Sequence, residues 1–343
     1  MQSKKRATTI TDIARAVNVS PKSVSRVVNN EPGVSEETRQ RILQAISDMG
    51  YVANTAARNM RGNAKVIGLV TSGFEDYAGQ VMRGASQIAQ QFGYNLVLYV
   101  QHAENQPVEA YRNLIGGQLI SALLMVVPYD YDLLVTLCAE YDMPYALVDY
   151  QGDTPVEDVP TITVTNRRGA LEATRYLLAL GHQRIGFITG TMDMVSARER
   201  LQGYQDALAE VAIPFDPTLV REGQWTQASG FAQTKALIEA FPDMSAVIAS
   251  DDLMAFGAMD AIKECGLHVG EDVSVIGFDD IPMAATVYPP LTTVRQPMLQ
   301  MGASAIELLI AQLEGDSVIA SQREFATELV IRQSTAKAPA KNS

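Results

Sequence analysis

The sequence contains few of the residues that form disulfides or bind metal ions. Its two cysteines, Cys138 and Cys265, lie far apart within apolar helical patterns, and its three histidines have no spacing typical of metal ligands. We therefore expect two buried, reduced thiols in a cytoplasmic protein, and we expect no metal ion or other cofactor.

Long hydrophobic runs and nucleotide-binding motifs are also missing. No apolar stretch at the N-terminus approaches the roughly eighteen residues of a membrane span, so we expect neither a signal peptide nor a membrane partner. Neither G-x-G-x-x-G nor G-x-x-x-x-G-K-[ST] occurs, and no nucleophile–base pair is evident, which argues against an enzyme such as a nucleotide-dependent dehydrogenase. A chain of 343 residues, 47% hydrophobic and 19% charged, is typical of a soluble globular protein with two or three domains.

Charge is divided unequally along the chain. The formal net charge is −12, yet residues 1–63 contain ten Lys and Arg against five Asp and Glu, and the remainder contains 17 against 34. A basic head attracts phosphates while an acidic body is repelled by them. The division therefore favours a nucleic-acid-binding N-terminal segment.

Two short helical patterns with a tight connection lie between residues 9 and 30. The first, residues 10–17, places Ile13, Ala14 and Val17 on one face. Ser20 and Pro21 then predict an N-cap followed by proline at the first helical position. The second helix can dock on the first through an apolar stripe that consists of Val24, Val27 and Val28.

The opposite face of this second helix carries side chains that are short or cationic, namely Pro21, Lys22, Ser25, Arg26 and Asn29. One face held by a partner and one free to enter a major groove are typical of a recognition helix. Amphipathicity alone equally fits a helical hairpin with a solvated polar face. A third helix, capped by Ser35 and ended by Gly50, completes a small bundle with an expected stripe of Ile42, Leu43, Ile46 and Met49.

From residue 66 the pattern changes to strands that alternate with helices. The strand-like runs are residues 66–71, 96–100, 122–127, 145–148, 161–164, 185–189, 246–249, 273–278 and 291–294. Helical patterns lie between most of them, for example at residues 79–92, 169–180, 197–209 and 254–264. Apolar strands separated by helices predict parallel sheets covered on both faces, and so many strands predict two lobes.

Polar side chains follow several of these strands, where ligands of open α/β sheets bind. They are Ser72, Asp149, Asp251 and Asp279. Carboxylates suit a polyhydroxylated ligand because each accepts two hydroxyl hydrogen bonds. Arg200 offers a forked donor, and Trp225, the only tryptophan, can stack on a pyranose. From the residues alone, each of these aspartates could equally be a helix cap. For Asp252 and Asp280 we expect a role as a helix cap or an ion-pair partner.

The run T-x-x-D-I-A-x-x-x-x-V-S-x-x-S-V-S-R-V-V-N, from Thr9 to Asn29, closely resembles the DNA-binding headpiece of the lactose/galactose repressor (LacI/GalR) family. REGxWxxxSGF, SxRxRLxGY, GFDD and YPPLTTVRQ are similar to stretches of its sugar-responsive members. The resemblance covers residues 8 to 333. It implies a bacterial, nucleoid-associated transcriptional repressor that binds palindromic operator DNA as a homodimer.

The family resemblance also implies roles for residues of the headpiece and hinge. Pro21, Lys22 and Arg26 would read the major groove with support from Ser25 and Asn29, and Thr9, Ser20 and Asn29 would contact phosphates. Residues 54–64 would form a hinge helix that becomes ordered when the protein binds its operator. The composition of this segment alone indicates a flexible linker. There Asn54 caps the helix, Ala57 touches the partner hinge, and Met60 replaces the family's leucine wedge in the minor groove.

For the core, the family resemblance implies a fold like that of periplasmic sugar-binding proteins. The effector contacts would be Ser72, Asp149, Val164, Arg200, Trp225, Asp251, Asp279, Gln296 and Met298. Asp251 stands where the lactose repressor has asparagine, and Val164 and Met298 replace bulkier residues. A galactoside-like sugar or glycoside is the expected effector, with a purine or phosphosugar corepressor as the alternative. A sugar-transport protein is a further class, disfavoured by the helix-turn-helix.

The predicted organisation is a headpiece at residues 1–53, a hinge at 54–64, a core at 65–333 and a disordered tail at 334–343. The core would consist of one lobe from residues 65–164 and 297–324, and a second from 165–293 and 325–333. No leucine heptads follow the core, so we expect a dimer without a tetramerising helix.

Overall fold

The computed structural model describes residues 9–28, 31–49, 65–73, 76–101, 108–117, 119–152, 159–315 and 322–339. The chain divides into two compact units, residues 1–64 and residues 65–343. Four residues of the predicted DNA interface, Asn29, Asn54, Ala57 and Met60, lie outside the described residues, as does the predicted hinge helix.

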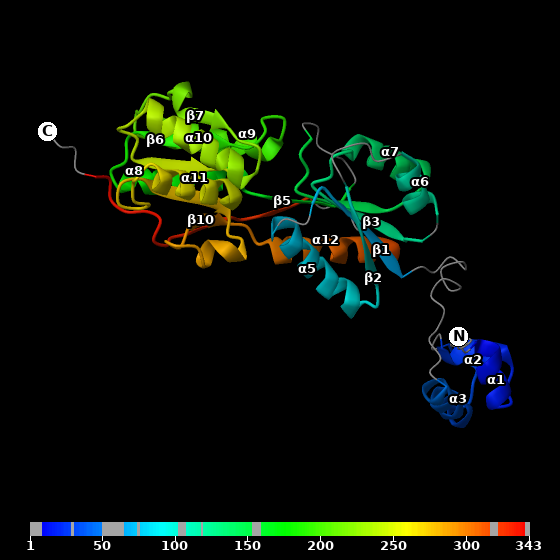
Figure 1. Cartoon of the computed structure of the whole chain (residues 1–343). Coiled ribbons are helices and arrows are strands. Elements are labelled where there is room, and N and C mark those ends of the chain that lie inside the picture. The colour runs from blue at the N-terminus through cyan, green and yellow to red at the C-terminus, as the bar shows by residue number, and fades with distance from the viewer. Residues whose placement is uncertain are drawn as a thin grey trace, which may run out of the picture. The chain divides into compact units, whose positions relative to one another are not determined.

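The first unit contains the three expected helices, α1 (Ile10–Ala16), α2 (Pro21–Val28) and α3 (Glu36–Asp48) (Figure 1). A capping box begins α1, because Thr9 Oγ1 accepts from the Asp12 amide while the Asp12 carboxylate accepts from the Thr9 amide. Ser20 Oγ accepts from the Ser23 amide at 3.1 Å, which confirms the predicted cap of α2. The N-caps at Thr9 and Ser20 therefore fix the residues at which α1 and α2 begin.

A small apolar core joins these three helices. It consists of Ile13, Ala14, Val24, Val27, Ile42 and Ala45. The prediction for α3 was wrong in part, since Leu43 and Met49 are 43% and 38% exposed. Ala45 lies on the inner face of α3 instead. Each large aliphatic residue buried in this way contributes about 1.5–3 kcal/mol.

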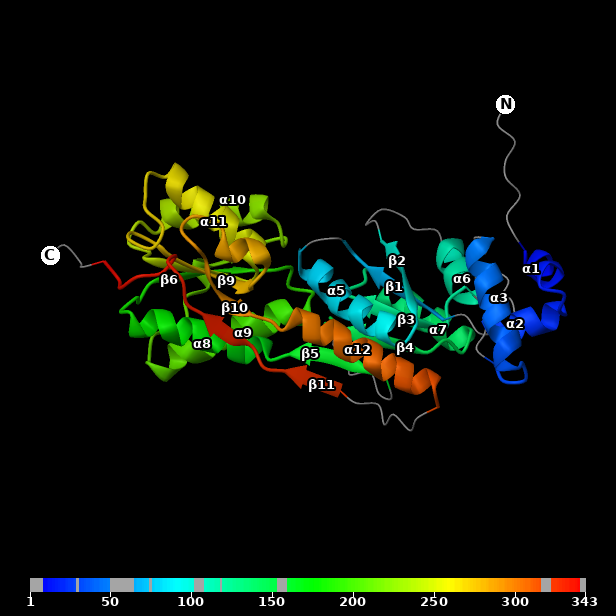
Figure 2. The same cartoon turned by 90° about the horizontal axis from the view of Figure 1, so that it is seen from below.

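The first sheet of the second unit contains six strands in the order β11-β5-β4-β3-β1-β2. Their bounds are β1 (Val66–Thr71), β2 (Asn95–Val100), β3 (Ala122–Val126), β4 (Tyr145–Val148), β5 (Thr161–Val164) and β11 (Gln322–Phe325). All neighbours pair in parallel. Helices α5 (Asp76–Gln91) and α12 (Met298–Leu313) cover one face, and α6 (Val108–Gly116) and α7 (Tyr131–Glu140) cover the other (Figures 1 and 2).

The second sheet also contains six strands, in the order β12-β10-β9-β8-β6-β7. Their bounds are β6 (Ile185–Thr189), β7 (Val220–Glu222), β8 (Ala246–Ala249), β9 (Ser274–Asp279), β10 (Thr292–Arg295) and β12 (Glu328–Val330). Only β12 runs antiparallel to its neighbour. Helices α8 (Asn166–Ala179) and α9 (Val195–Glu210) cover one face, and α10 (Gln227–Ala240) and α11 (Asp252–Glu264) cover the other. Two short 3₁₀ turns, Pro217–Leu219 and Pro282–Ala285, complete the lobe.

The chain crosses between the two lobes three times. The first crossing leads from β5 to α8, the second from β10 to α12, and the third from β11 to β12. Thr165 and Thr327 join the first and third crossings, because the Thr327 amide donates to Thr165 Oγ1 at 3.0 Å. Phe325 pairs with Val164 in the first sheet, so the predicted lobe boundary before residue 325 was early by one residue.

The expectation of a disordered tail from residue 334 was wrong for residues 334–339. Ser334 is fully buried, accepts from the Thr292 amide at 2.8 Å and donates to the Val275 carbonyl at 2.7 Å. Ala336 O lies 3.0 Å from the imidazole of His182. These small residues satisfy buried polar groups of the second sheet, which composition cannot reveal.

Both cysteines are free, as expected, although Cys265 is only partly buried. Burial raises the pKa of the Cys138 thiol to about 12. Among the described residues, no helix is long and apolar enough to cross a membrane.

Candidate functional site

A cavity of about 490 Å³ lies between the two lobes, within the range of about 300–1,000 Å³ typical of small-molecule sites. Its walls are formed by residues that follow the carboxyl ends of β1, β3 and β4 in the first lobe and of β6, β7, β8 and β9 in the second. Seven predicted effector contacts line it, namely Ser72, Asp149, Arg200, Trp225, Asp251, Asp279 and Gln296.

Two predicted effector contacts do not line the cavity. Val164 is 2% exposed and ends β5, and Met298 is 5% exposed and begins α12. Both belong to an apolar core cluster. The structure therefore does not bring these two side chains to the cavity wall with the other seven.

Arg200 projects from α9 and is almost fully buried, with 3% exposure. Its Nε donates to Asn166 Oδ1 at 2.9 Å and its Nη1 donates to the Ser250 carbonyl. The guanidinium lies 3.7 Å from the centroid of the Phe278 ring. These contacts hold the fork in one orientation at the cavity wall, with Nη1 3.9 Å from Asp279 Oδ1.

Trp225 lies in the loop between β7 and α10 with a φ of +56°. Its Nε1 donates to Thr191 Oγ1 at 3.1 Å. The indole packs directly on Gly190, where an added Cβ would lie 1.8 Å from Trp225 Cζ2. The absence of a side chain at residue 190 therefore allows the indole to lie in the cavity wall.

Three carboxylates that line the cavity are nearly buried, with exposures of 9% for Asp149, 6% for Asp251 and 8% for Asp279. Burial raises the pKa of Asp251 to about 6 and that of Asp279 to about 8, and Arg200 opposes both shifts. Burial also raises the pKa of Asp149, again opposed by Arg200. Asp251 in addition caps α11, accepting from the Met254 amide at 2.7 Å.

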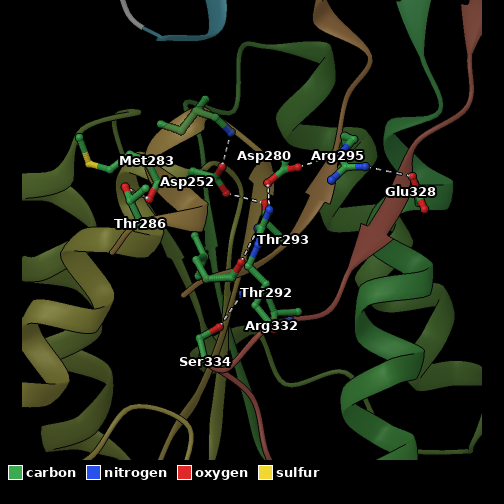
Figure 3. Close-up of polar contacts among 12 residues, drawn as sticks. Asp252, Asp280, Met283, Thr286, Thr292, Thr293, Arg295, Glu328, Arg332 and Ser334 are labelled. Atoms are coloured by element: carbon green, nitrogen blue, oxygen red, sulfur yellow. Dashed lines mark hydrogen bonds and ion pairs between the residues drawn. The ribbon is translucent and has the colours of Figure 1, made fainter. Parts of the chain in front are cut away.

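Asp252 and Asp280 lie behind the cavity in a polar network between β9, β10 and the C-terminal segment (Figure 3). Asp280 pairs with Arg295 at 2.7 Å and with Arg332 at 2.6 Å, which confirms its predicted ion pairing. Asp251, rather than Asp252, caps α11, and Asp252 forms no ion pair with any residue that the structure describes. It accepts from the Ile281 amide at 2.9 Å and from the Thr293 hydroxyl, and burial together with Asp279 raises its pKa.

Sequence reasoning missed several residues of the cavity. Tyr77 and Tyr129 line it from the first lobe. Gln151 joins the lobes, since its Oε1 accepts from both the amide and the hydroxyl of Ser196 at 3.0 Å. Gln151 follows Asp149 at a strand end and could have been found by that position, whereas nothing in the sequence marks the two tyrosines.

The polar face of α2 remains accessible within the first unit. Pro21 and Lys22 are exposed, and Ser25 and Arg26 are partly exposed. The Thr9 hydroxyl caps α1 and the Ser20 hydroxyl caps α2, so both side chains are held in a fixed orientation at the start of their helix. Among the described residues, no group of three or more His, Cys, Asp or Glu could hold a metal ion.

Comparison with known proteins gives matches over both units. Residues 9–54 match bacterial regulatory proteins of the lacI family, and residues 174–335 match the periplasmic binding protein-like domain. The HTH-type transcriptional regulator CelR of Thermobifida fusca is 33% identical, over 96% of this chain and 99% of the relative. The HTH-type transcriptional repressor PurR of Aliivibrio salmonicida is 30% identical, over 96% and 99%.

Solved structures agree with these sequence matches. The lac repressor dimer bound to operator and the anti-inducer ONPF has a TM-score of 0.84 and 32% identity, over 96% of this chain and 100% of that one. A CelR–cellobiose complex has a TM-score of 0.75 and 31% identity, over 95% and 99%. These relatives are transcriptional regulators rather than enzymes. The chain belongs to the lacI family of bacterial regulatory proteins.

Proposed function

We propose that the protein is a homodimeric transcriptional repressor whose affinity for a palindromic operator falls when a sugar or glycoside binds between the core lobes. The observation that carries this proposal is the cavity itself, which gathers Asp149, Arg200, Trp225 and Asp279 from both lobes. Carboxylates and a fixed guanidinium suit sugar hydroxyls, and an indole suits the apolar face of a pyranose. The cellobiose complex of CelR supports the same ligand class.

For the DNA interface, we propose that Pro21, Lys22 and Arg26 read base edges in the major groove, with Ser25 and Asn29 in support. Thr9 and Ser20 would contact phosphates from the starts of α1 and α2. In the hinge, Asn54 would cap a short helix, Ala57 would meet its twin and Met60 would enter the minor groove. The solved complex of the lac repressor dimer with operator supports this mode of binding.

The proposed mechanism runs from the cavity through the lobe crossings. Asp279 accepts from Gln296 Nε2 at 2.6 Å, and its carbonyl accepts from the Gln296 amide at 3.2 Å. Gln296 stands in the crossing from β10 to α12, so a ligand that contacts Asp279 acts directly on a segment between the lobes. Lobe closure around a sugar would then favour an arrangement of the two subunits that disfavours operator binding.

A purine ligand that acts as corepressor is a second candidate. Tyr77 and Tyr129 line the cavity together with Trp225, so aromatic partners for a planar base are present. The similarity to PurR supports the same alternative. A phosphosugar is less favoured, because a phosphate would meet several carboxylates in the cavity.

The test uses Trp225, the only tryptophan of the chain, as a fluorescent reporter. The full-length protein is titrated with monosaccharides, disaccharides and purines, with and without palindromic DNA selected from a random library. A saturable change with a sugar that also weakens DNA binding is the expected result. A response only to purines, or a sugar that strengthens DNA binding, would contradict the assignment of a sugar inducer.

A further inference from the structure

The cavity has a marked excess of negative charge. Among the described residues that line it, Arg200 is the only cation, and there are five carboxylates, Asp76, Asp149, Asp193, Asp251 and Asp279. Three of these, Asp149, Asp251 and Asp279, are less than one-tenth exposed. Water therefore screens their mutual repulsion poorly, and the chemistry of the ligand must accommodate it.

Arg200 offsets the charge of the three buried carboxylates only in part. Its donors are directed to Asn166 and to the Ser250 carbonyl, and its contact with Asp279 is a distant 3.9 Å. One guanidinium offsets one carboxylate at most. Two negative charges would remain when all three aspartates are ionised, in a cavity whose walls include Trp225, Leu253 and Ile281.

The cavity holds two buried polar groups without a partner among the described residues, the Tyr77 hydroxyl and the Gln296 Oε1 acceptor. Gln296 is 3% exposed; its amide nitrogen donates to Asp279, and its Oε1 is a buried acceptor without a partner among the described residues. Two donors of the cavity wall are already used, since Trp225 Nε1 donates to Thr191 and Gln151 Nε2 donates to the Asp149 carbonyl. A ligand that satisfies Gln296 Oε1 must bring a donor to it.

Burial of the carboxyl groups in the cavity favours their neutral form. Burial raises the pKa of Asp251 to about 6 and that of Asp279 to about 8, which favours the neutral form of Asp279 among the three neighbouring carboxyls. A bound ammonium group would supply positive charge and three donors at the same place. Binding of a cation would then release the proton, whereas binding of a neutral sugar would not.

We infer that the cavity selects an effector with a protonated amino group, an amino sugar or aminoglycoside, whose ammonium lies among Asp149, Asp251 and Asp279. The inference rests on the proposed function, because it names the effector class of the same site. Asp251 is the residue that sets the preference. It adds the third buried carboxylate, and asparagine at this position would keep the cap of α11 while removing the charge.

The experiment compares matched ligands by calorimetry at pH 7 on the full-length protein. Glucosamine is compared with glucose, N-acetylglucosamine and glucosamine 6-phosphate, and the galactose series is treated in the same way. We expect each amino sugar to bind at least about tenfold more tightly than its neutral counterparts, with the phosphorylated form weakest. Titration in two buffers of different ionisation enthalpy should show proton release with the amino sugar alone.

Asp251→Asn should reduce this preference to about threefold or less, without loss of the folded state in thermal denaturation. The matched control is Asp260→Asn on the exposed side of the same helix, which should leave the preference unchanged. Equal or tighter binding of neutral sugars would overturn the inference and leave the proposed function standing. A cavity that binds no sugar of any charge would overturn both.

Discussion

At the scale of single residues, backbone strain gathers around the cavity. Val127, Asp149, Trp225 and Asp279 all line it, and all have positive φ angles of +43°, +55°, +56° and +116°. Non-glycine residues in such conformations cost of order 1–3 kcal/mol each. The preceding strands hold them there, as the Asp149 amide donates to the Ile162 carbonyl at 2.8 Å. Four residues that line the cavity therefore share a backbone conformation that is costly for L-amino acids.

The raised pKa of Asp279 predicts that the stability of the protein depends on pH. This pKa of about 8 lies above the ordinary value near 4, so the native state binds a proton that the unfolded state releases. The contribution to stability is present below pH 4 and is lost as the pH rises toward 8. We expect Asp279→Asn to be more stable than the wild type at pH 8 by about 1–3 kcal/mol and to lose less stability between pH 5 and pH 8.

Urea denaturation at the two pH values measures this difference. Asp206→Asn is the control, because Arg167 lowers the pKa of Asp206 and its titration lies below this window. A wild-type protein with equal stability at pH 5 and pH 8 would contradict the proposed origin of the dependence.

Gly190 should be essential for the position of the indole. An alanine Cβ would lie 1.8 Å from Trp225 Cζ2, so the ring must leave the cavity wall. Loss of a stacking contact of about 1.5 kcal/mol predicts roughly tenfold weaker effector binding for Gly190→Ala, measured by calorimetry. Gly79→Ala is the matched control, since Gly79 has no neighbour within 4 Å of the added Cβ. Equal affinities of the two variants would show that the indole does not bind the effector.

At the scale of elements, the sequence predicts the strands of the sheet interiors well. β3 and β8 are short apolar runs with every residue buried, and their bounds agree with prediction within one residue. β7, β11 and β12 were missed because each is a short edge strand with polar residues, such as Gln322–Phe325. Periodicity detects burial, and edge strands are only partly buried.

The pairing of α5 with α12 could not be predicted from the hydrophobic pattern of the sequence. An added Cβ at Gly84 of α5 would lie 1.9 Å from the Leu299 carbonyl oxygen, and one at Gly302 of α12 would lie 1.9 Å from the Val81 carbonyl oxygen. The two glycines thus let α5 and α12 approach backbone to backbone (Figure 2). From the sequence alone, a glycine inside a helix is expected to lower the stability of that helix. The close contact with the partner helix explains why glycine is present.

The residues that line the cavity could likewise be predicted only in part from the sequence. The strand ends identified Asp149, Asp251 and Asp279, because that rule follows from the topology of parallel sheets. Tyr77 was missed, since its role depends on which way the start of α5 faces.

The network around Asp280 should anchor β10 to the C-terminal segment (Figure 3). Asp280 and Arg332 have side-chain exposures of 8% and 16%, whereas Arg295 is 46% exposed. Arg332 also donates to the Leu291 carbonyl at 2.7 Å. We expect Arg332→Met to destabilise the protein by about 2–4 kcal/mol and Arg295→Met by about 1 kcal/mol or less, because water screens the exposed pair. Urea denaturation at one protein concentration tests this, and equal losses would contradict it.

At the scale of the whole molecule, the division of charge agrees with the division into units. Residues 1–64 hold the helix-turn-helix, and the acidic remainder holds the cavity. A repressor with this division directs its basic surface to DNA and keeps its body away from phosphates. The cavity that we propose for the effector is acidic as well, which disfavours anionic ligands.

If operator and effector bind as we propose, any effect of one ligand on the affinity for the other must be reciprocal. If an effector weakens operator binding by 100-fold, a coupling of about 2.7 kcal/mol, the operator must weaken effector binding by the same factor. Trp225 fluorescence measures the effector affinity with and without saturating operator, and operator binding is measured separately with and without saturating effector. Agreement of the two factors would assign the coupling to the cavity. An operator that leaves the Trp225 titration unchanged while the effector still releases DNA would mean that release acts through another site.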